Sequence, residues 1–265
     1  MDGEESAPNL RAINGFAVTA TPWPGRLSAL AALLGGLALL NASPASARLT
    51  TGFVQELEEA LNSGNESAIA ILVQGSDGLI RSDLESRYAQ LRERFPDSRW
   101  SLSLGPDQAD GRSTLEVKVE GSSSRDGRSF RLNASQTLAV DSDGTTLGDQ
   151  EVLSEESVVH SGERDLPVSL MVPDTVLTGQ RYDFDVLMDE PLSDAVLAGG
   201  LAELTPEQLS SGEGPDLKLG ALNAGGIFKT IQAPYRPGSQ SWAVLLLHPQ
   251  GTVSISRMVR VVNRL

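Results

Sequence analysis

Several residue types that carry enzyme chemistry are scarce or missing. The 265-residue chain has no cysteine and only two histidines, His160 and His248, each at the end of an expected strand. Disulfides and zinc sites of the usual Cys/His type are therefore excluded. A Ser-His-Asp catalytic triad could use only one of these two histidines. No nucleophile elbow, phosphate-binding loop or zinc-protease motif occurs. These absences favour a non-enzyme that carries no metal and no organic cofactor.

Basic charge is also in short supply. The chain has 21 Lys and Arg against 35 Asp and Glu, a net charge of −14, and its only lysines are Lys118, Lys218 and Lys229. This balance argues against nucleic acid as a partner and against a polybasic membrane patch. Aromatic residues make up only 5%. The cores must therefore consist mostly of Leu, Val, Ile and Ala, and each Trp or Tyr is worth locating.

An apolar run near the N-terminus predicts export. Leu27–Leu40 is uninterrupted by charge, follows Arg26, and precedes an A-x-A cleavage site at Ala45-Ser46-Ala47. This is the order of a secretory signal peptide over residues 1–47, with cleavage before Arg48. An uncleaved anchor and a buried core helix are the alternatives, and the acids Asp2, Glu4 and Glu5 do not suit a signal peptide. We expect the protein in a periplasm, a lumen or outside the cell.

From residue 49 to Pro96 the apolar spacing is helical. Phe53, Leu57 and Leu61 share one helix face, and Asn65 can begin a second helix. A third helix is predicted from a capping box at Ser82–Glu85, with an apolar stripe that includes Leu84, Tyr88, Leu91 and Phe95.

From Trp100 to Val159 the spacing changes to two residues, which predicts four antiparallel strands with a loop at Ser122–Gly127. The expected fold class is α+β, with three helices packed on a curved antiparallel sheet. This order, in which Arg94-Phe95-Pro96-Asp97 leads directly into Trp100, resembles the nuclear transport factor 2-like superfamily over about residues 49–160. The resemblance implies a cone-shaped domain with a pocket between helices and sheet, used by enzymes, ligand binders or dimerising modules.

The rest of the chain predicts only strands. After a polar linker at residues 161–165, apolar residues alternate in Tyr182–Met188, Trp242–Leu246 and Val253–Val261. Residues 166–265 resemble an immunoglobulin-like β-sandwich, although no Cys pair or strand-C Trp supports the likeness. We therefore expect two domains, at 48–160 and 166–265.

Three residues are candidates to line a ligand pocket. Gln136 is in register with Leu132, Ala134 and Leu138 on a face that should be buried, where an amide needs a hydrogen-bond partner. That partner is either a neighbouring part of the protein or a ligand. Tyr88 and Trp100 lie where the helices meet the sheet, as core residues or as a ligand platform.

The sequence favours an exported, non-catalytic binding or assembly protein of the cell envelope. In this interpretation the first domain dimerises or holds a small apolar ligand, and the sandwich contacts a protein partner. The alternatives are a small-molecule isomerase, dehydratase or hydrolase, which would show a buried carboxylate, and a lipid or pigment carrier, which would show an apolar cavity.

Overall fold

The computed structural model describes residues 48–73, 88–162, 165–189, 197–211, 214–222 and 225–264. The signal-peptide segment and the capping box at Ser82–Glu85 lie outside these residues. None of the helices in the described ranges has the length and apolar content that a membrane crossing requires.

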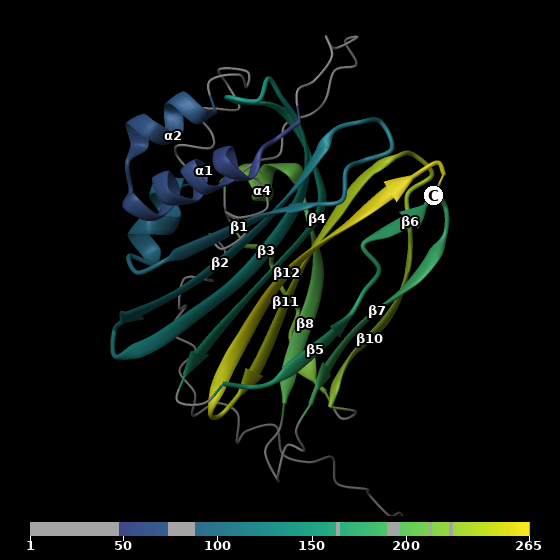
Figure 1. The fold of residues 1–265 in the computed structure, drawn as a ribbon. Coiled ribbons are helices and arrows are strands. Elements are labelled where there is room, and N and C mark those ends of the chain that lie inside the picture. Colours follow the sequence, from purple (N-terminus) through teal and green to yellow (C-terminus); the bar gives the residue numbers. More distant parts are fainter. Residues whose placement is uncertain are drawn as a thin grey trace, which may run out of the picture.

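Most of the structure is antiparallel β-sheet (Figure 1). The helices are α1 (Thr51–Ser63), α2 (Glu66–Leu72), a helical segment at 88–94 and α4 (Pro206–Ser211). The strands are β1 (Arg99–Gly105), β2 (Ser113–Arg125), β3 (Arg128–Ser142), β4 (Leu147–Gly162), β5 (Val168–Met171), β6 (Thr175–Leu177), β7 (Arg181–Met188), β8 (Ala198–Leu204), β9 (Gly220–Ala221), β10 (Gly226–Gln232), β11 (Gly238–His248) and β12 (Gly251–Val262).

One sheet runs through both halves of the chain. It has nine strands in the order β1-β2-β3-β4-β12-β11-β8-β9, with β6 added in parallel to β12. A second sheet has the order β10-β7-β5. The predicted fold class, three helices on a sheet followed by a separate immunoglobulin-like sandwich, is therefore wrong: strand makes up 56% and helix 16%, and β4 pairs with β12 from Gly162 to Glu155. Alternating apolar residues predict that a segment is a strand. They do not predict which strand it pairs with, because pairing uses backbone N–H and C=O groups that are alike in every non-proline residue.

Helix α1 has a favourable capping residue at each end. The Thr50 side chain accepts a hydrogen bond from the Phe53 backbone N–H, and Gly64 ends the helix in the left-handed conformation at φ 71°. Phe53, Leu57 and Leu61 are buried on the face turned to β1–β4.

Two side chains of α1 also bond to the open edge of the large sheet. Asn62 accepts a hydrogen bond from the Trp100 N–H and donates one to the Trp100 carbonyl, both at 2.8 Å. Glu58 accepts one from the Leu102 N–H at 2.7 Å. Residues four apart on a helix rise about 6 Å, close to the step of two residues along a strand. Helix α1 thus satisfies backbone groups of β1 that would otherwise be free to pair with another strand.

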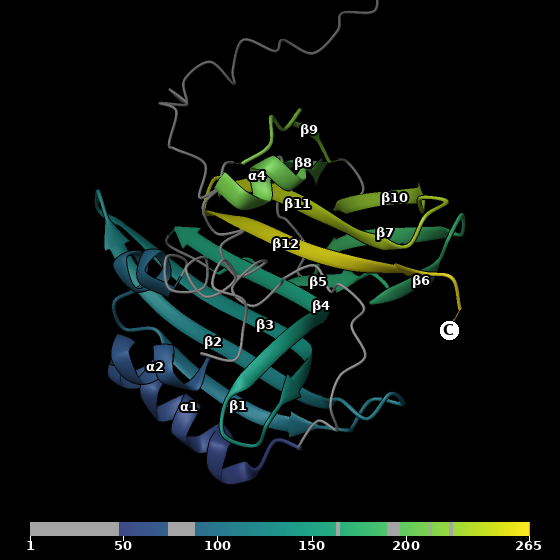
Figure 2. The ribbon, with the colours of Figure 1, turned by 90° about the horizontal axis from the view of Figure 1, so that it is seen from above.

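The two cores lie on opposite faces of the large sheet. Val159 belongs to the core beneath the helices, whereas its neighbour Val158 packs against the core formed with β5, β7 and β10. Successive residues of a strand point to opposite faces, so β4 contributes to both cores. Figure 2 shows α1 and α2 beside β1 and β2, and β7 and β10 beside β11 and β12.

A network of ion pairs lies beside the β4–β12 junction, and one of them joins the two halves of the chain. Glu151 of β4 bonds with one carboxylate oxygen to Arg260 of β12 at 2.7 Å and with the other to Arg112, before β2, at 2.8 Å. Strand pairing and these charges together join the predicted domains into one sheet.

Candidate functional site

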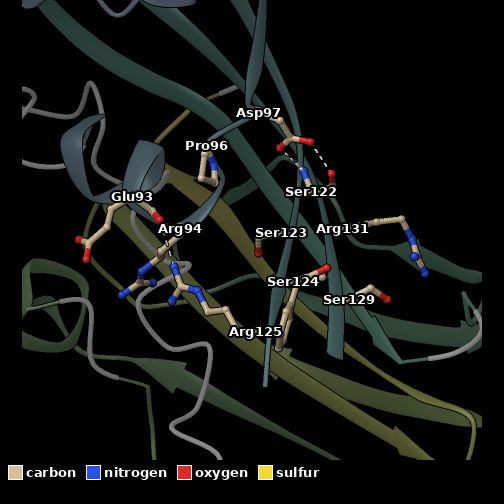
Figure 3. Close-up of a pocket in the computed structure, with 11 residues that line it drawn as sticks. Glu93, Arg94, Pro96, Asp97, Ser122, Ser123, Ser124, Arg125, Ser129 and Arg131 are labelled. Atoms are coloured by element: carbon tan, nitrogen blue, oxygen red, sulfur yellow. Dashed lines mark hydrogen bonds between the residues drawn. The ribbon is translucent and has the colours of Figure 1, made fainter. Parts of the chain in front are cut away.

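A groove of about 660 Å³ opens between the end of the 88–94 helical segment and the β2–β3 hairpin (Figure 3). Arginine and serine side chains dominate its lining. The lining residues are Glu93, Arg94, Pro96, Asp97, Ser122, Ser123, Ser124, Arg125, Ser129, Phe130 and Arg131.

The groove exists because β2 and β3 extend further than the sequence indicated. Arg125 pairs with Arg128, so the expected loop at Ser122–Gly127 reduces to the two-residue turn Asp126-Gly127. Both turn residues have positive φ, 50° and 73°, as a type I′ hairpin turn requires. The serines are therefore strand residues. The Asp-Gly pair was the sequence signal that could have predicted this hairpin.

Asp97 connects the two walls of the groove, because it follows the 88–94 segment and bonds to Ser122 of β2. Its carboxylate accepts hydrogen bonds from the backbone N–H of Ser122, at 2.7 Å, and from the Ser122 hydroxyl. These hydrogen bonds lower the pKa of Asp97 below its ordinary value, so the carboxylate is ionised at neutral pH. Next to Ser122, the two walls pack closely. A Cβ atom added to Gly121 would lie only 3.0 Å from Cβ of Phe95.

The groove gathers positive charge and hydroxyl groups. Figure 3 shows the guanidinium ends of Arg94 and Arg125 side by side, with Arg131 turned away on the far side. Arg125 donates to the Glu93 carbonyl at 3.1 Å, and Arg131 donates to Asp165 at 2.8 Å.

Hydroxyl groups lie between these arginines. The Ser123 and Ser124 hydroxyls make no hydrogen bond within the described ranges. Guanidinium and hydroxyl donors suit the oxygen atoms of a carboxylate, sulfate or phosphate.

Two of the three residues predicted from the sequence lie together in the helix-side core. The Tyr88 and Trp100 rings are 5.8 Å apart between centroids, and both side chains are buried. The Tyr88 hydroxyl donates to the Leu61 carbonyl, and burial raises its pKa. The indole nitrogen of Trp100 is buried and has no hydrogen-bond partner among the described residues. Neither residue lines the groove.

Gln136 lies apart from this pair, on β3. It stands opposite Val117 of β2 and Glu155 of β4, and its amide nitrogen donates to the Glu155 carboxylate at 3.1 Å. Both side chains are only 2% exposed. The sequence reasoning missed Glu155, although its spacing of two and four residues from Ser157 and Val159 puts it on the same face.

Neither histidine lines the groove, although His160 stands opposite its lining residue Arg131. Among the described residues, no group of three His, Cys, Asp or Glu side chains is arranged to hold a metal ion. His248 accepts a hydrogen bond from the Gln250 N–H at 3.2 Å, and His160 stands in register between Arg131 and Val253.

His160 gives the protein a predictable response to acid. Burial lowers its pKa below the ordinary 6.5, Asp165 opposes this shift and Arg131 adds to it. The unfolded chain therefore binds more protons at this residue, and the free energy of unfolding falls as the pH drops through 6.5 toward the folded-state pKa. Chemical denaturation between pH 5 and 8 should show this fall, and His160→Gln should show a smaller one. Equal pH dependence in both proteins would contradict the assignment.

Comparison with known proteins reaches only the C-terminal part. A family model described as Domain of unknown function (DUF8623) matches residues 163–262. No curated protein matches the chain. The matched span starts directly after β4 and contains β5–β12, whereas all residues that line the groove lie before it.

Proposed function

We propose that this chain is an exported, non-catalytic binding protein that holds an anionic group in the groove between the 88–94 segment and the β2–β3 hairpin. The observation that carries the proposal is the lining itself. Three arginines and four serines line the groove, together with the carboxylates of Glu93 and Asp97, in a chain whose net charge is −14. Asp97 is already hydrogen-bonded to Ser122 and Arg131 is paired with Asp165, which leaves two adjacent guanidinium groups and the hydroxyls between them to meet a ligand. An overall negative protein repels anions, so concentrated guanidinium and hydroxyl donors provide the local attraction that such a ligand needs.

The groove chemistry favours binding over catalysis. A serine becomes a nucleophile when a base such as histidine lies within hydrogen-bond reach, and no histidine lines this groove. The lining also favours a polar ligand over the small apolar ligand that the sequence suggested, because Pro96 and Phe130 are the only apolar members among the described lining residues. Export remains supported by the sequence of residues 27–47, and the acidic charge supports a partner other than nucleic acid.

Removal of one guanidinium tests the proposal. We expect sulfate, phosphate or citrate to bind the protein in calorimetric titrations, and glucose not to bind. Arg125→Gln should weaken anion binding by about tenfold, because a charge-assisted hydrogen bond is worth about 1.5–3 kcal/mol. Arg181→Gln is the matched control, since it removes an exposed arginine on β7 and should change affinity by less than about twofold. Equal effects of the two variants, or no anion binding at all, would reject the proposal.

A second function, a small-molecule isomerase, dehydratase or hydrolase, is favoured by Glu155. Its carboxylate is 2% exposed on the helix-side face of the sheet, and Gln136 hydrogen-bonds it. A buried carboxylate is a common acid or base in such enzymes. Conversion of a metabolite mixture by the wild type, but not by a folded Glu155→Gln variant, would replace the binding proposal with this one.

A further inference from the structure

The outer face of the β10-β7-β5 sheet carries a second set of exposed groups. Strand β7 at its centre alternates strictly: Tyr182, Phe184 and Val186 point into the sandwich core and are buried. Asp183 and Asp185 therefore point to the outer face. This face lies within the 163–262 match and involves none of the residues that line the groove.

One row across this face combines apolar and acidic side chains. Phe228 of β10 and Met171 of β5 both stand directly opposite Asp185, so all three side chains project from the same face. Phe228 is 49% exposed and Met171 is 58% exposed. In the next row Asp183 accepts a hydrogen bond from Thr230 at 2.8 Å. Two carboxylates thus lie beside two exposed apolar side chains.

Asp185 is the unusual member of this row. It is partly buried, and its carboxylate makes no hydrogen bond or ion pair with any described residue. This carboxylate is an acceptor that an added cation could pair with through a charge-assisted hydrogen bond. An arginine placed there would also lie beside the Phe228 ring, where a cation is attracted to the aromatic face.

We propose that this face binds a protein segment that presents an arginine flanked by apolar side chains. The cation pairs with Asp185, and the apolar neighbours cover Phe228 and Met171. Charge complementarity selects this partner over a second copy of the same chain, because two copies of net charge −14 repel each other. The proposal does not depend on anion binding in the groove, so either can fail alone.

A peptide probe can test this surface in the full-length mature chain. The probe is a fluorescein-labelled heptapeptide of alternating Leu and Arg, and a second peptide has Glu in place of Arg. By fluorescence anisotropy we expect the arginine peptide to bind and the glutamate peptide not to bind. Asp185→Asn should weaken binding about tenfold, as expected when a central charged contact is lost. Phe228→Ser should weaken binding to a similar degree, since it removes the apolar and aromatic contact.

Matched controls separate this site from general attraction between a basic peptide and an acidic protein. Asp126→Asn removes one exposed charge at the distant β2–β3 turn and should change affinity by less than about twofold. Thermal melts of all variants check that each remains folded. Equal loss with Asp126→Asn and Asp185→Asn, full retention of binding by Phe228→Ser, or equal binding of the glutamate peptide would each overturn the proposal.

Discussion

Gly162→Ala is expected to destabilise the protein by about 3–5 kcal/mol, because it combines backbone strain with a steric clash. Gly162 ends β4 with φ 124°, a conformation that residues with a side chain rarely adopt. An added methyl group would lie 2.6 Å from Cα of Gly251 and 2.8 Å from the carbonyl oxygen of Gln250. Both are backbone atoms of the β11–β12 connection and cannot rotate away. Chemical denaturation of wild type and variant measures the loss.

Gly111→Ala is the matched control for this prediction. Gly111 also has positive φ, 90°, but no atom of a described residue lies within 4 Å of the position that the methyl group would take. This variant should lose only the strain, about 1 kcal/mol. Equal losses at the two positions would show that β4 and β12 do not approach as closely as described. A stable Gly162→Ala variant would argue against the continuous sheet.

Gln136→Leu is expected to cost about 3 kcal/mol of folding free energy. The substitution removes the amide that donates to Glu155, and the carboxylate stays buried at 2% exposure. Removing one partner of a buried acceptor costs more than an ordinary hydrogen bond contributes, because water cannot reach the acceptor to replace the lost hydrogen bond. A thermal melt beside the wild type should show a clear loss of Tm, with anion binding in the groove unchanged.

Ser135→Ala provides the control for Gln136→Leu. Ser135 is the preceding residue of β3, but it is exposed on the opposite face and should change stability by less than about 0.5 kcal/mol. An unchanged Tm for Gln136→Leu would show that Glu155 does not need this amide. The ligand-facing role of Gln136 would then become the better interpretation.

Local patterns predicted the secondary structure of several segments and the burial of particular residues. The four-residue spacing of Phe53, Leu57 and Leu61 matches the buried face of α1, and Gly64 ends that helix. Gln136 was expected on a buried face and is buried there. These features depend on neighbours within a few residues along the chain, which helical or strand periodicity records directly.

The candidate groove could not be predicted in the same way. Its two walls come from the 88–94 segment and from β2 and β3, about 30 residues further along the chain. The sequence interpretation placed Ser122–Ser124 in a loop, because serine runs are typical of loops. The Asp126-Gly127 turn shows that a two-residue turn signal should have outweighed that composition.

The sequence by itself determined the acidic charge, the absence of disulfides, the α1 helix face and the alternation within the strands. Only the tertiary structure decided that β12 pairs with β4, that Glu155 accepts from Gln136, and that Asp185 lies between Phe228 and Met171. The physical reason is that strand partners are joined through backbone N–H and C=O groups, which every non-proline residue offers alike. Side-chain periodicity can therefore show which face of a strand is buried, whereas the neighbouring strand is selected by the packing of the whole chain.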